Sequence, residues 1–303
     1  MSQSTFGKKF TVTTWGESHG KALGTVVDGV PAGLFLTEAD IQTYLDRRKP
    51  GQSRYTTARN EGDEVEILSG IFEGQTTGTP ISMIVRNKDQ RSRDYGNIAQ
   101  TYRPGHADFG FDSKYGFRDY RGGGRSSGRE TIGRVAAGAI AARILKELGI
   151  TLQAYTSSIG PVSCQSYHPE IIPENSFYMP DMVAAEKAAK YLEKCMKEED
   201  SAGGVVECRI SGVPAGIGDP VFGKLDAAFA QALMSIGAVK AVEIGDGVKV
   251  STMKGSENND GFHMENGRIV KTTNHSGGIL GGISDGGEIL LRAHIKPDRK
   301  SVV

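Results

Sequence analysis

The sequence is organised around Arg118-Asp119-Tyr120-Arg121-Gly122-Gly123-Gly124-Arg125-Ser126-Ser127-Gly128-Arg129-Glu130-Thr131, a glycine loop with four arginines that runs directly into a helical pattern. Consecutive glycines allow positive φ angles and let the backbone approach a ligand closely. The following helix points its unpaired N–H groups and positive dipole end back at the loop. Arginine binds phosphate or carboxylate through two parallel hydrogen bonds. The stretch therefore predicts an anion-binding site. The alternative is a solvated linker or an RNA-binding Arg-Gly segment, although such segments are low in complexity and do not open a patterned helix.

Length and composition narrow the class of protein. The chain has 303 residues, enough for one large domain or two ordinary ones with a substantial core. Lys plus Arg and Asp plus Glu both number 36, so no net field recruits nucleic acid and an anion site must be a local concentration of charge. The cysteines lack CxxC spacing, as is typical of reduced thiols, and no apolar run is long enough to cross a bilayer. We expect a cytoplasmic protein with no nucleic-acid, membrane or metal partner.

Apolar spacing predicts both helices and strands. Apolar residues recur at three- and four-residue steps over 128–148, which predicts a long central helix, and a charged helix is expected over 184–198. Another helix should begin at Thr37, with Asp40 as its capping partner. Its apolar face is expected to comprise Ile41, Tyr44 and Leu45. Strands are expected at 25–27, 65–67, 81–85, 205–210 and 289–295.

A five-residue word occurs twice. Gly-Val-Pro-Ala-Gly at 29–33 recurs at 212–216, each time after a β-rich run and before an amphipathic helix. Such self-similarity predicts two related β-turn-α units packed into one body. Chance recurrence in a glycine-rich chain is the alternative.

Two turn histidines are candidates for acid–base chemistry. His19 lies in Gly-Glu-Ser-His-Gly at 16–20, which fits the Gly-x-Ser-x-Gly pattern of a serine-hydrolase nucleophile. That interpretation is excluded because a strand, not the required helix, is predicted next. His106 follows a Pro-Gly turn a short loop before the arginine-glycine stretch. Histidine has an unperturbed pKa near neutrality, so both could give or take a proton; the alternative is a turn histidine bonded to backbone.

Other features extend the expected site. Arg47, Arg48, Lys49, Arg54 and Arg59 predict a second anion patch, with a solvated face as the alternative. A second glycine loop at 274–286 could hold phosphate, but it matches neither the P-loop nor the Rossmann fingerprint. These residues predict a site for acid–base chemistry on a phosphorylated carboxylate, together with a second, flat, phosphate-bearing molecule.

Several sequence motifs occur in the same order as in chorismate synthases, which the chain resembles from about residue 6 to 297. They are Gly-Glu-Ser-His-Gly at 16–20, Asp-Arg-Arg at 46–48 before Pro-Gly, Arg-Pro-Gly-His-Ala-Asp at 103–108, the stretch 118–131, Val-Glu-Ile-Gly-Asp-Gly at 242–247 and the loop 274–282. The resemblance implies 1,4-anti elimination of phosphate from 5-enolpyruvylshikimate 3-phosphate to give chorismate in the shikimate pathway. It also implies an α+β fold, a β-α-β sandwich with helices layered between antiparallel sheets, in a single domain over 1–303 that assembles as a homotetramer.

The resemblance also implies residue roles. His19 would protonate the departing phosphate, and His106 would stabilise the reduced flavin as a cation near its anionic ring edge. Reduced FMN is implied as the cofactor, without net redox change and reduced by an external NAD(P)H-dependent source. The substrate's phosphate and carboxylates would be held by Ser18, Arg48, Arg54 and Arg129. The FMN site would be lined by Arg125, Ser126, Ser127, Gly237, Ala238, Gly281 and Lys296.

The match departs from the family near the end of the sequence. Family members continue past a Lys-Pro pair with Thr or Ser residues for the flavin and then with an Arg-x-Asp-Pro-Cys segment, whereas Lys296-Pro297 is followed here by 298–303. We expect that segment to be absent after about 297. This keeps a truncated homologue that binds FMN or substrate with little or no turnover as the alternative. A flavin oxidoreductase and a non-catalytic anion-binding homologue are further competing interpretations.

Overall fold

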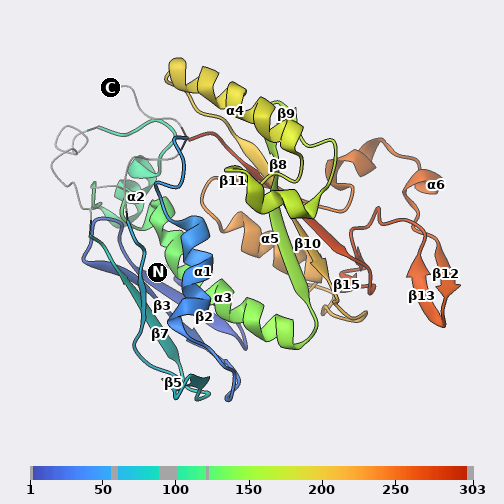
Figure 1. Cartoon of the computed structure of the whole chain (residues 1–303), viewed down its shortest axis with the longest axis horizontal. Helices are drawn as coiled ribbons and strands as arrows, with labels where there is room; N and C mark the ends of the chain where they lie inside the picture. The colour runs from blue at the N-terminus through green and yellow to red at the C-terminus, as the bar shows by residue number, and fades with distance from the viewer. Residues whose placement is uncertain (1–2, 56–60, 89–100, 121–122, 299–303) are drawn as a thin grey trace. The chain divides into compact units, whose positions relative to one another are not determined.

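The computed structural model describes residues 3–55, 61–88, 101–120 and 123–298, which form two compact units, 1–144 and 145–302 (Figure 1). Arg59, Arg121 and Gly122 of the predicted anion sites lie outside the described residues. Each unit contains a five-stranded antiparallel sheet together with helices, which confirms the α+β class. The prediction of a single domain over 1–303 stays a prediction.

Unit 1 is built on a sheet with strand order β1-β2-β3-β7-β4. These strands are β1 (Thr5–Gly7), β2 (Thr11–Gly16), β3 (Ala22–Asp28), β7 (Ile81–Arg86) and β4 (Val65–Ile67). A small hairpin pairs β5 (Ile71–Phe72) with β6 (Gln75–Thr76). The helices are α1 (Glu38–Arg48), α2 (Asp108–Tyr115) and α3 (Thr131–Glu147).

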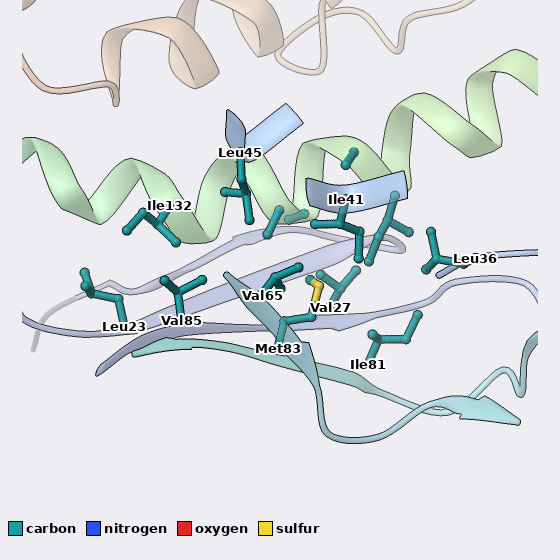
Figure 2. Packing of buried hydrophobic residues seen from close by; sticks show 14 of the residues in the cluster. Leu23, Val27, Leu36, Ile41, Leu45, Val65, Ile81, Met83, Val85 and Ile132 are labelled. Carbon is teal, nitrogen blue, oxygen red and sulfur yellow. The ribbon is translucent and has the colours of Figure 1, made fainter. Parts of the chain in front are cut away.

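The core of unit 1 lies between this sheet and helices α1 and α3, whose apolar side chains point at the strands (Figure 2). The Asp40 carboxylate accepts the Thr37 N–H at 2.8 Å, which confirms the predicted start of α1. Ile41 and Leu45 are fully buried, but Tyr44 is 42% exposed, so including it in the apolar face was wrong. Positions 41 and 45 are one helical turn apart, whereas position 44 turns toward the helix edge.

Unit 2 has a sheet with strand order β11-β16-β10-β8-β9. Its strands are β11 (Val239–Ile244), β16 (Ile289–Ile295), β10 (Gly204–Ser211), β8 (Thr151–Ile159) and β9 (Val162–Ser163). The helices are α4 (Met182–Lys197), α5 (Leu225–Met234) and the short α6 (Gly255–Asn258). Two hairpins pair β12 (Phe262–Glu265) with β13 (Arg268–Lys271) and β14 (Ile279–Leu280) with β15 (Ile283–Ser284). No described helix is long and apolar enough to cross a membrane.

The repeated word marks equivalent corners of the two units, which confirms the internal pseudo-repeat. In unit 1 the Thr76 hydroxyl donates to the carbonyl of Pro31 at 2.6 Å and accepts the N–H of Leu34 at 2.9 Å. In unit 2 the Ser284 hydroxyl donates to the carbonyl of Pro214 at 2.6 Å and accepts the N–H of Ile217 at 2.9 Å. Each word follows a sheet strand and precedes a helix, as predicted.

The central helix starts later than its apolar pattern suggested. Two 3-10 turns, Gly124–Ser126 and Gly128–Glu130, precede α3, so the α-helix begins at Thr131 instead of about 128. The Ser127 hydroxyl accepts the Arg129 N–H at 3.4 Å and so caps the second turn. The tight entry turns Arg129 inward, where its side chain is 6% exposed.

Candidate functional site

The first element of the site is the loop between β2 and β3, which carries Ser18 and His19. Ser18 is 1% exposed, and its Oγ lies 2.8 Å from His19 Nδ1. The loop closes on itself because the Gly20 N–H donates to the Glu17 carbonyl at 3.1 Å. A strand follows, as expected, so the serine is not on the strand-to-helix elbow of a hydrolase. The serine hydroxyl therefore holds the imidazole at a defined nitrogen.

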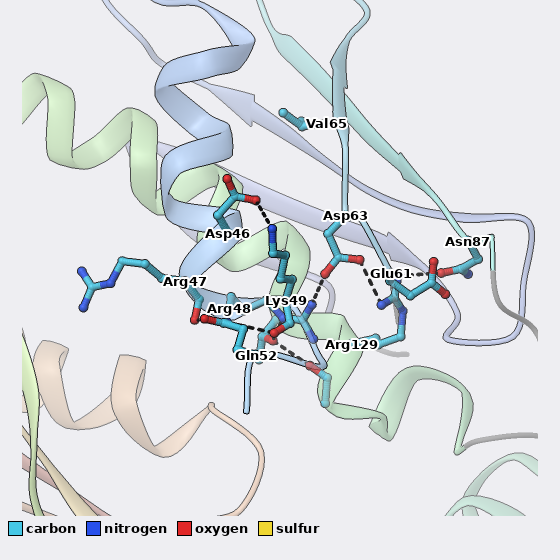
Figure 3. Close-up of polar contacts among 12 residues, drawn as sticks. Asp46, Arg47, Arg48, Lys49, Gln52, Glu61, Asp63, Val65, Asn87 and Arg129 are labelled. Atoms are coloured by element: carbon cyan, nitrogen blue, oxygen red, sulfur yellow. Dashed lines mark hydrogen bonds and ion pairs between the residues drawn. The ribbon is translucent and has the colours of Figure 1, made fainter. Parts of the chain in front are cut away.

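Two of the predicted substrate arginines meet one buried carboxylate (Figure 3). The Asp63 side chain is fully buried; its Oδ2 lies 2.5 Å from Arg48 Nη1 and its Oδ1 lies 3.0 Å from Arg129 Nη1. Arg48 Nε also donates to Thr131 Oγ1 at 3.1 Å, and Arg129 Nη2 donates to Asn87 Oδ1 at 2.8 Å. We call Arg48, Asp63, Asn87 and Arg129 the arginine cluster. Two positive charges against one negative charge leave it suited to bind an anion.

Asn87 connects the arginine cluster to the histidine loop. While its Oδ1 accepts from Arg129, its Nδ2 donates to the carbonyls of Glu17 at 3.1 Å and Gly20 at 2.8 Å. The structure thus brings Arg129 and the loop of His19 together through one amide side chain. Neither Asn87 nor Asp63 was predicted from the sequence. The only signal was a polar residue just outside a predicted strand, at 87 after the strand ending near 85 and at 63 before the strand starting at 65.

The arginine-glycine loop is fastened to the end of β2, directly before the histidine loop. Arg125 Nη2 donates to the Thr14 carbonyl at 3.1 Å and to its hydroxyl at 2.7 Å, while Nη1 donates to the Gly16 carbonyl at 3.2 Å. The Ser126 hydroxyl donates to the Gly123 carbonyl at 2.7 Å. These predicted flavin residues therefore also hold the loop in place.

The second histidine lies in a separate, well-braced turn. His106 Nδ1 is 3.0 Å from the Pro104 carbonyl, so the ring is oriented by its own turn. Asp108, which begins α2, receives a two-point contact from Arg103 at 2.8 and 2.7 Å, and this lowers the pKa of Asp108 to about 2. A Cβ built on Gly123 would lie 3.5 Å from Arg103 Nη2, so this turn adjoins the arginine-glycine loop.

Arg54, the remaining predicted substrate residue, is exposed. Its Nη2 donates to the Tyr55 hydroxyl at 2.7 Å and its guanidinium carbon lies 4.9 Å from the centre of the Tyr55 ring. Its substrate role stays a prediction. No group of three or more His, Cys, Asp or Glu side chains among the described residues could hold a metal ion.

The predicted flavin residues of unit 2 fall at two ends of one helix. The Lys296 N–H donates to the Ala238 carbonyl at 2.9 Å, which places Lys296 beside Gly237 and Ala238, just after α5 ends. Gly281 precedes Gly282, whose carbonyl accepts the N–H of the first residue of α5. A ten-residue helix is roughly 15 Å long, so Gly281 is separated from the other three. A Cβ at Gly237 or Gly281 would meet nothing within 4 Å, so neither glycine is required there by close packing.

The fold and site define an α+β enzyme class in which buried arginines adjoin a turn histidine. Comparison with known proteins narrows the class. The sequence model of the family described as chorismate synthase matches residues 10–301. The chorismate synthase of Lachnoclostridium phytofermentans is 64% identical, over 98% of this chain and 82% of the relative. That of Agathobacter rectalis is 63% identical with the same two coverages. A solved structure titled "Crystal Structure of Chorismate Synthase" superposes with a TM-score of 0.82 at 32% identity, over 96% of this chain and 85% of that one.

The chain belongs to the chorismate synthase family. It is accordingly a carbon–oxygen lyase of the shikimate pathway, which supplies aromatic amino acid biosynthesis. Identity of 63–64% over 98% of the chain favours this activity over a homologue that binds without turnover.

Proposed function

We propose that the protein converts 5-enolpyruvylshikimate 3-phosphate to chorismate by 1,4-anti elimination of phosphate, with reduced FMN as cofactor. The proposal rests mainly on the burial and the incomplete hydrogen bonding of the Arg129 side chain. Its side chain is buried, and its Nε has no hydrogen-bond partner among the described residues. A buried charged donor without a partner is costly, and an anionic oxygen would satisfy it. A phosphorylated dicarboxylate supplies such oxygens.

In this proposal the arginines hold the substrate, His19 supplies a proton and His106 supplies a positive charge. Arg48, Arg54 and Arg129 bind its phosphate and carboxylates with Ser18, and exclusion of water strengthens those contacts as phosphate departs. His19 protonates the phosphate, and the Ser18 hydroxyl, 2.8 Å from His19 Nδ1, orients the ring. His106 would stabilise the bound reduced flavin as a cation near its anionic ring edge. When bound, reduced FMN would lend transient electron density to the allylic system without net oxidation and would accept the ring proton that the elimination removes.

We propose that Arg125, Ser126 and Ser127, and likewise Gly237, Ala238, Gly281 and Lys296, contribute to FMN binding. Arg125, Ser126 and Ser127 supply a cation and hydroxyls from the arginine-glycine loop, and Lys296 adds a second cation. Support for grouping Ala238 with Lys296 is the hydrogen bond from the Lys296 N–H to the Ala238 carbonyl at 2.9 Å. The other family properties, a homotetramer in the cytoplasm and flavin reduction by an external NAD(P)H-dependent source, are proposed on the family membership alone.

An anaerobic turnover assay tests the proposal. The protein is incubated with reduced FMN and 5-enolpyruvylshikimate 3-phosphate, and chorismate, phosphate and flavin redox state are measured. Equal amounts of chorismate and phosphate with the flavin still reduced are expected. Consumption of NADPH without the substrate would instead indicate a flavin oxidoreductase, and binding without products would indicate a homologue that has lost turnover.

A further inference from the structure

We propose that Asp63 is the positioning residue that sets the separation and orientation of the two guanidinium groups that bind the substrate. The inference rests on the proposed function, since it takes Arg48 and Arg129 as substrate residues. Asp63 contacts both, one with each carboxylate oxygen, at 2.5 and 3.0 Å (Figure 3). Its side chain is fully buried, so the carboxylate acts through the arginines.

The backbone around Asp63 is built to present this carboxylate. Its φ angle is +46°, a left-handed conformation that aspartate and asparagine adopt more readily than most residues. Gln42 of α1 fastens the segment from the other side. Its Nε2 donates to the Asp63 carbonyl at 3.4 Å and its Oε1 accepts the Val65 N–H at 3.1 Å. The backbone that carries the carboxylate is thus fastened to helix α1 on both sides of residue 64.

Electrostatics explains why a carboxylate is needed between the arginines. Two guanidinium groups drawn toward one anion repel each other when the anion is absent, and more strongly where water is excluded. A carboxylate between them offsets this repulsion. Each arginine has an outer anchor as well, Thr131 for Arg48 and Asn87 for Arg129, so Asp63 is their common inner anchor. Donors fixed in advance need not reorganise when the ligand arrives.

The first test is Asp63→Asn, which keeps the shape and tolerates the backbone angle but removes the charge. Affinity for 5-enolpyruvylshikimate 3-phosphate and for FMN is measured by calorimetry on the folded protein. We expect substrate affinity to fall by about 10- to 100-fold, as displacement of positioned groups does, with FMN affinity within about 2-fold. The matched control is Glu64→Gln, because Glu64 is the next residue and pairs with the exposed Lys88 at 2.5 Å. It should bind both ligands normally.

A second pair of variants covers the case in which Asp63→Asn does not fold. Arg48→Met combined with Asp63→Asn removes one charge of each sign, so the net charge of the arginine cluster is that of the natural protein. If Asp63 orients Arg129, the double variant should bind substrate at least about 5-fold more weakly than Arg48→Met alone. Equal affinities of these two proteins would overturn the inference.

The outcomes also separate this inference from the proposed function. If Arg48→Met alone binds substrate normally, the assignment of substrate residues is wrong, and both proposals fall. If Arg48→Met weakens binding but Asp63→Asn binds like the natural protein, only the role of Asp63 is refuted. Equal weakening of substrate and FMN binding by Asp63→Asn would indicate a general structural role and would likewise refute it.

Discussion

Arg129 illustrates how the fold gives a single side chain its functional environment. A 3-10 turn capped by Ser127 directs it inward, Asn87 ties it to the histidine loop, and Asp63 pairs with it from a buried position. None of these contacts is local in sequence except the cap. Arg129, one of several arginines in a glycine-rich stretch, thereby becomes buried with its Nε unsatisfied among the described residues.

Replacement of His106 tests its proposed role as a cation beside the flavin. His106→Ala should lower turnover by about 10- to 1,000-fold with folding intact, because loss of a positioned acid–base or charged group costs that much. Steady-state phosphate release measures this, and His263→Ala, on the exposed strand β12, is the control. A near-normal rate for His106→Ala would remove this residue from the mechanism.

Acid stability should report on the Arg103–Asp108 pair. The pKa of Asp108 is lowered from 3.8 to about 2, so its contribution is complete above about pH 4 and is lost as pH falls through 2. Asp108→Asn should therefore lower the free energy of unfolding at pH 7 by about 2 kcal/mol, and the difference should narrow toward pH 2. Denaturant unfolding at several pH values measures it. A difference that does not change with pH would contradict the assignment.

The residue types of the site could be predicted from the sequence, but the contacts between them could not. Arg48, Arg129 and His19 were predicted, and the structure joins them through Asp63 and Asn87, which carry no motif of their own. Each of these two gains its role only because β7 and β4 are neighbours in the sheet. Sequence spacing does not tell which loop ends meet at a sheet edge. Residues such as Asp63 and Asn87 therefore cannot be identified as site residues from motifs.

At the scale of elements, helix α3 shows why a glycine can lie inside a helix. A Cβ on Gly133 would lie 2.9 Å from Thr14 Cγ2 and 3.2 Å from the Gly24 carbonyl oxygen, so the helix packs directly on β2 and β3. Gly138, one and a half turns further, has no atom within 4 Å of such a Cβ. Close packing at Gly133 brings the start of α3, and with it Arg129, against the end of β2.

These two glycines make a matched test. Gly133→Ala should lower the free energy of unfolding by about 1–3 kcal/mol because the methyl group overpacks the helix–sheet contact. Gly138→Ala should raise it by about 0.5–1 kcal/mol, since alanine is the better helix former and meets no obstacle. Thermal or urea unfolding measures both. Two changes of the same sign would show that the contact does not control packing here.

Most helix and strand positions could be predicted from the spacing of apolar residues, because α1, α4, α5 and the main strands each have a periodic apolar face. The start of α3 was misplaced because periodicity does not distinguish an α-turn from the 3-10 turns that precede it. Tyr44 fits the three- and four-residue spacing of the apolar face of α1, yet it is 42% exposed, because spacing alone does not define the edge of a buried face.

At the scale of the molecule, two units repeat one design. Thr76 and Ser284 are 3% exposed and each makes the same two backbone hydrogen bonds to the repeated word. Thr76→Val and Ser284→Ala should each lower the free energy of unfolding by about 1–3 kcal/mol, because a buried carbonyl and N–H lose their partner. Ser251→Ala, at an exposed hydroxyl, is the control. A large effect in one unit alone would argue against equivalent corners.

The central claim is that the substrate's anionic groups bind at the arginine cluster. Its most direct test is the affinity of 5-enolpyruvylshikimate 3-phosphate for Arg129→Met compared with Arg134→Met, whose arginine pairs with Glu130 on a half-exposed face of α3. We expect Arg129→Met to weaken binding by about 30-fold or more, as loss of a charged hydrogen-bonding partner does, and Arg134→Met to bind within about 2-fold of the natural protein. Normal affinity in Arg129→Met would contradict the account.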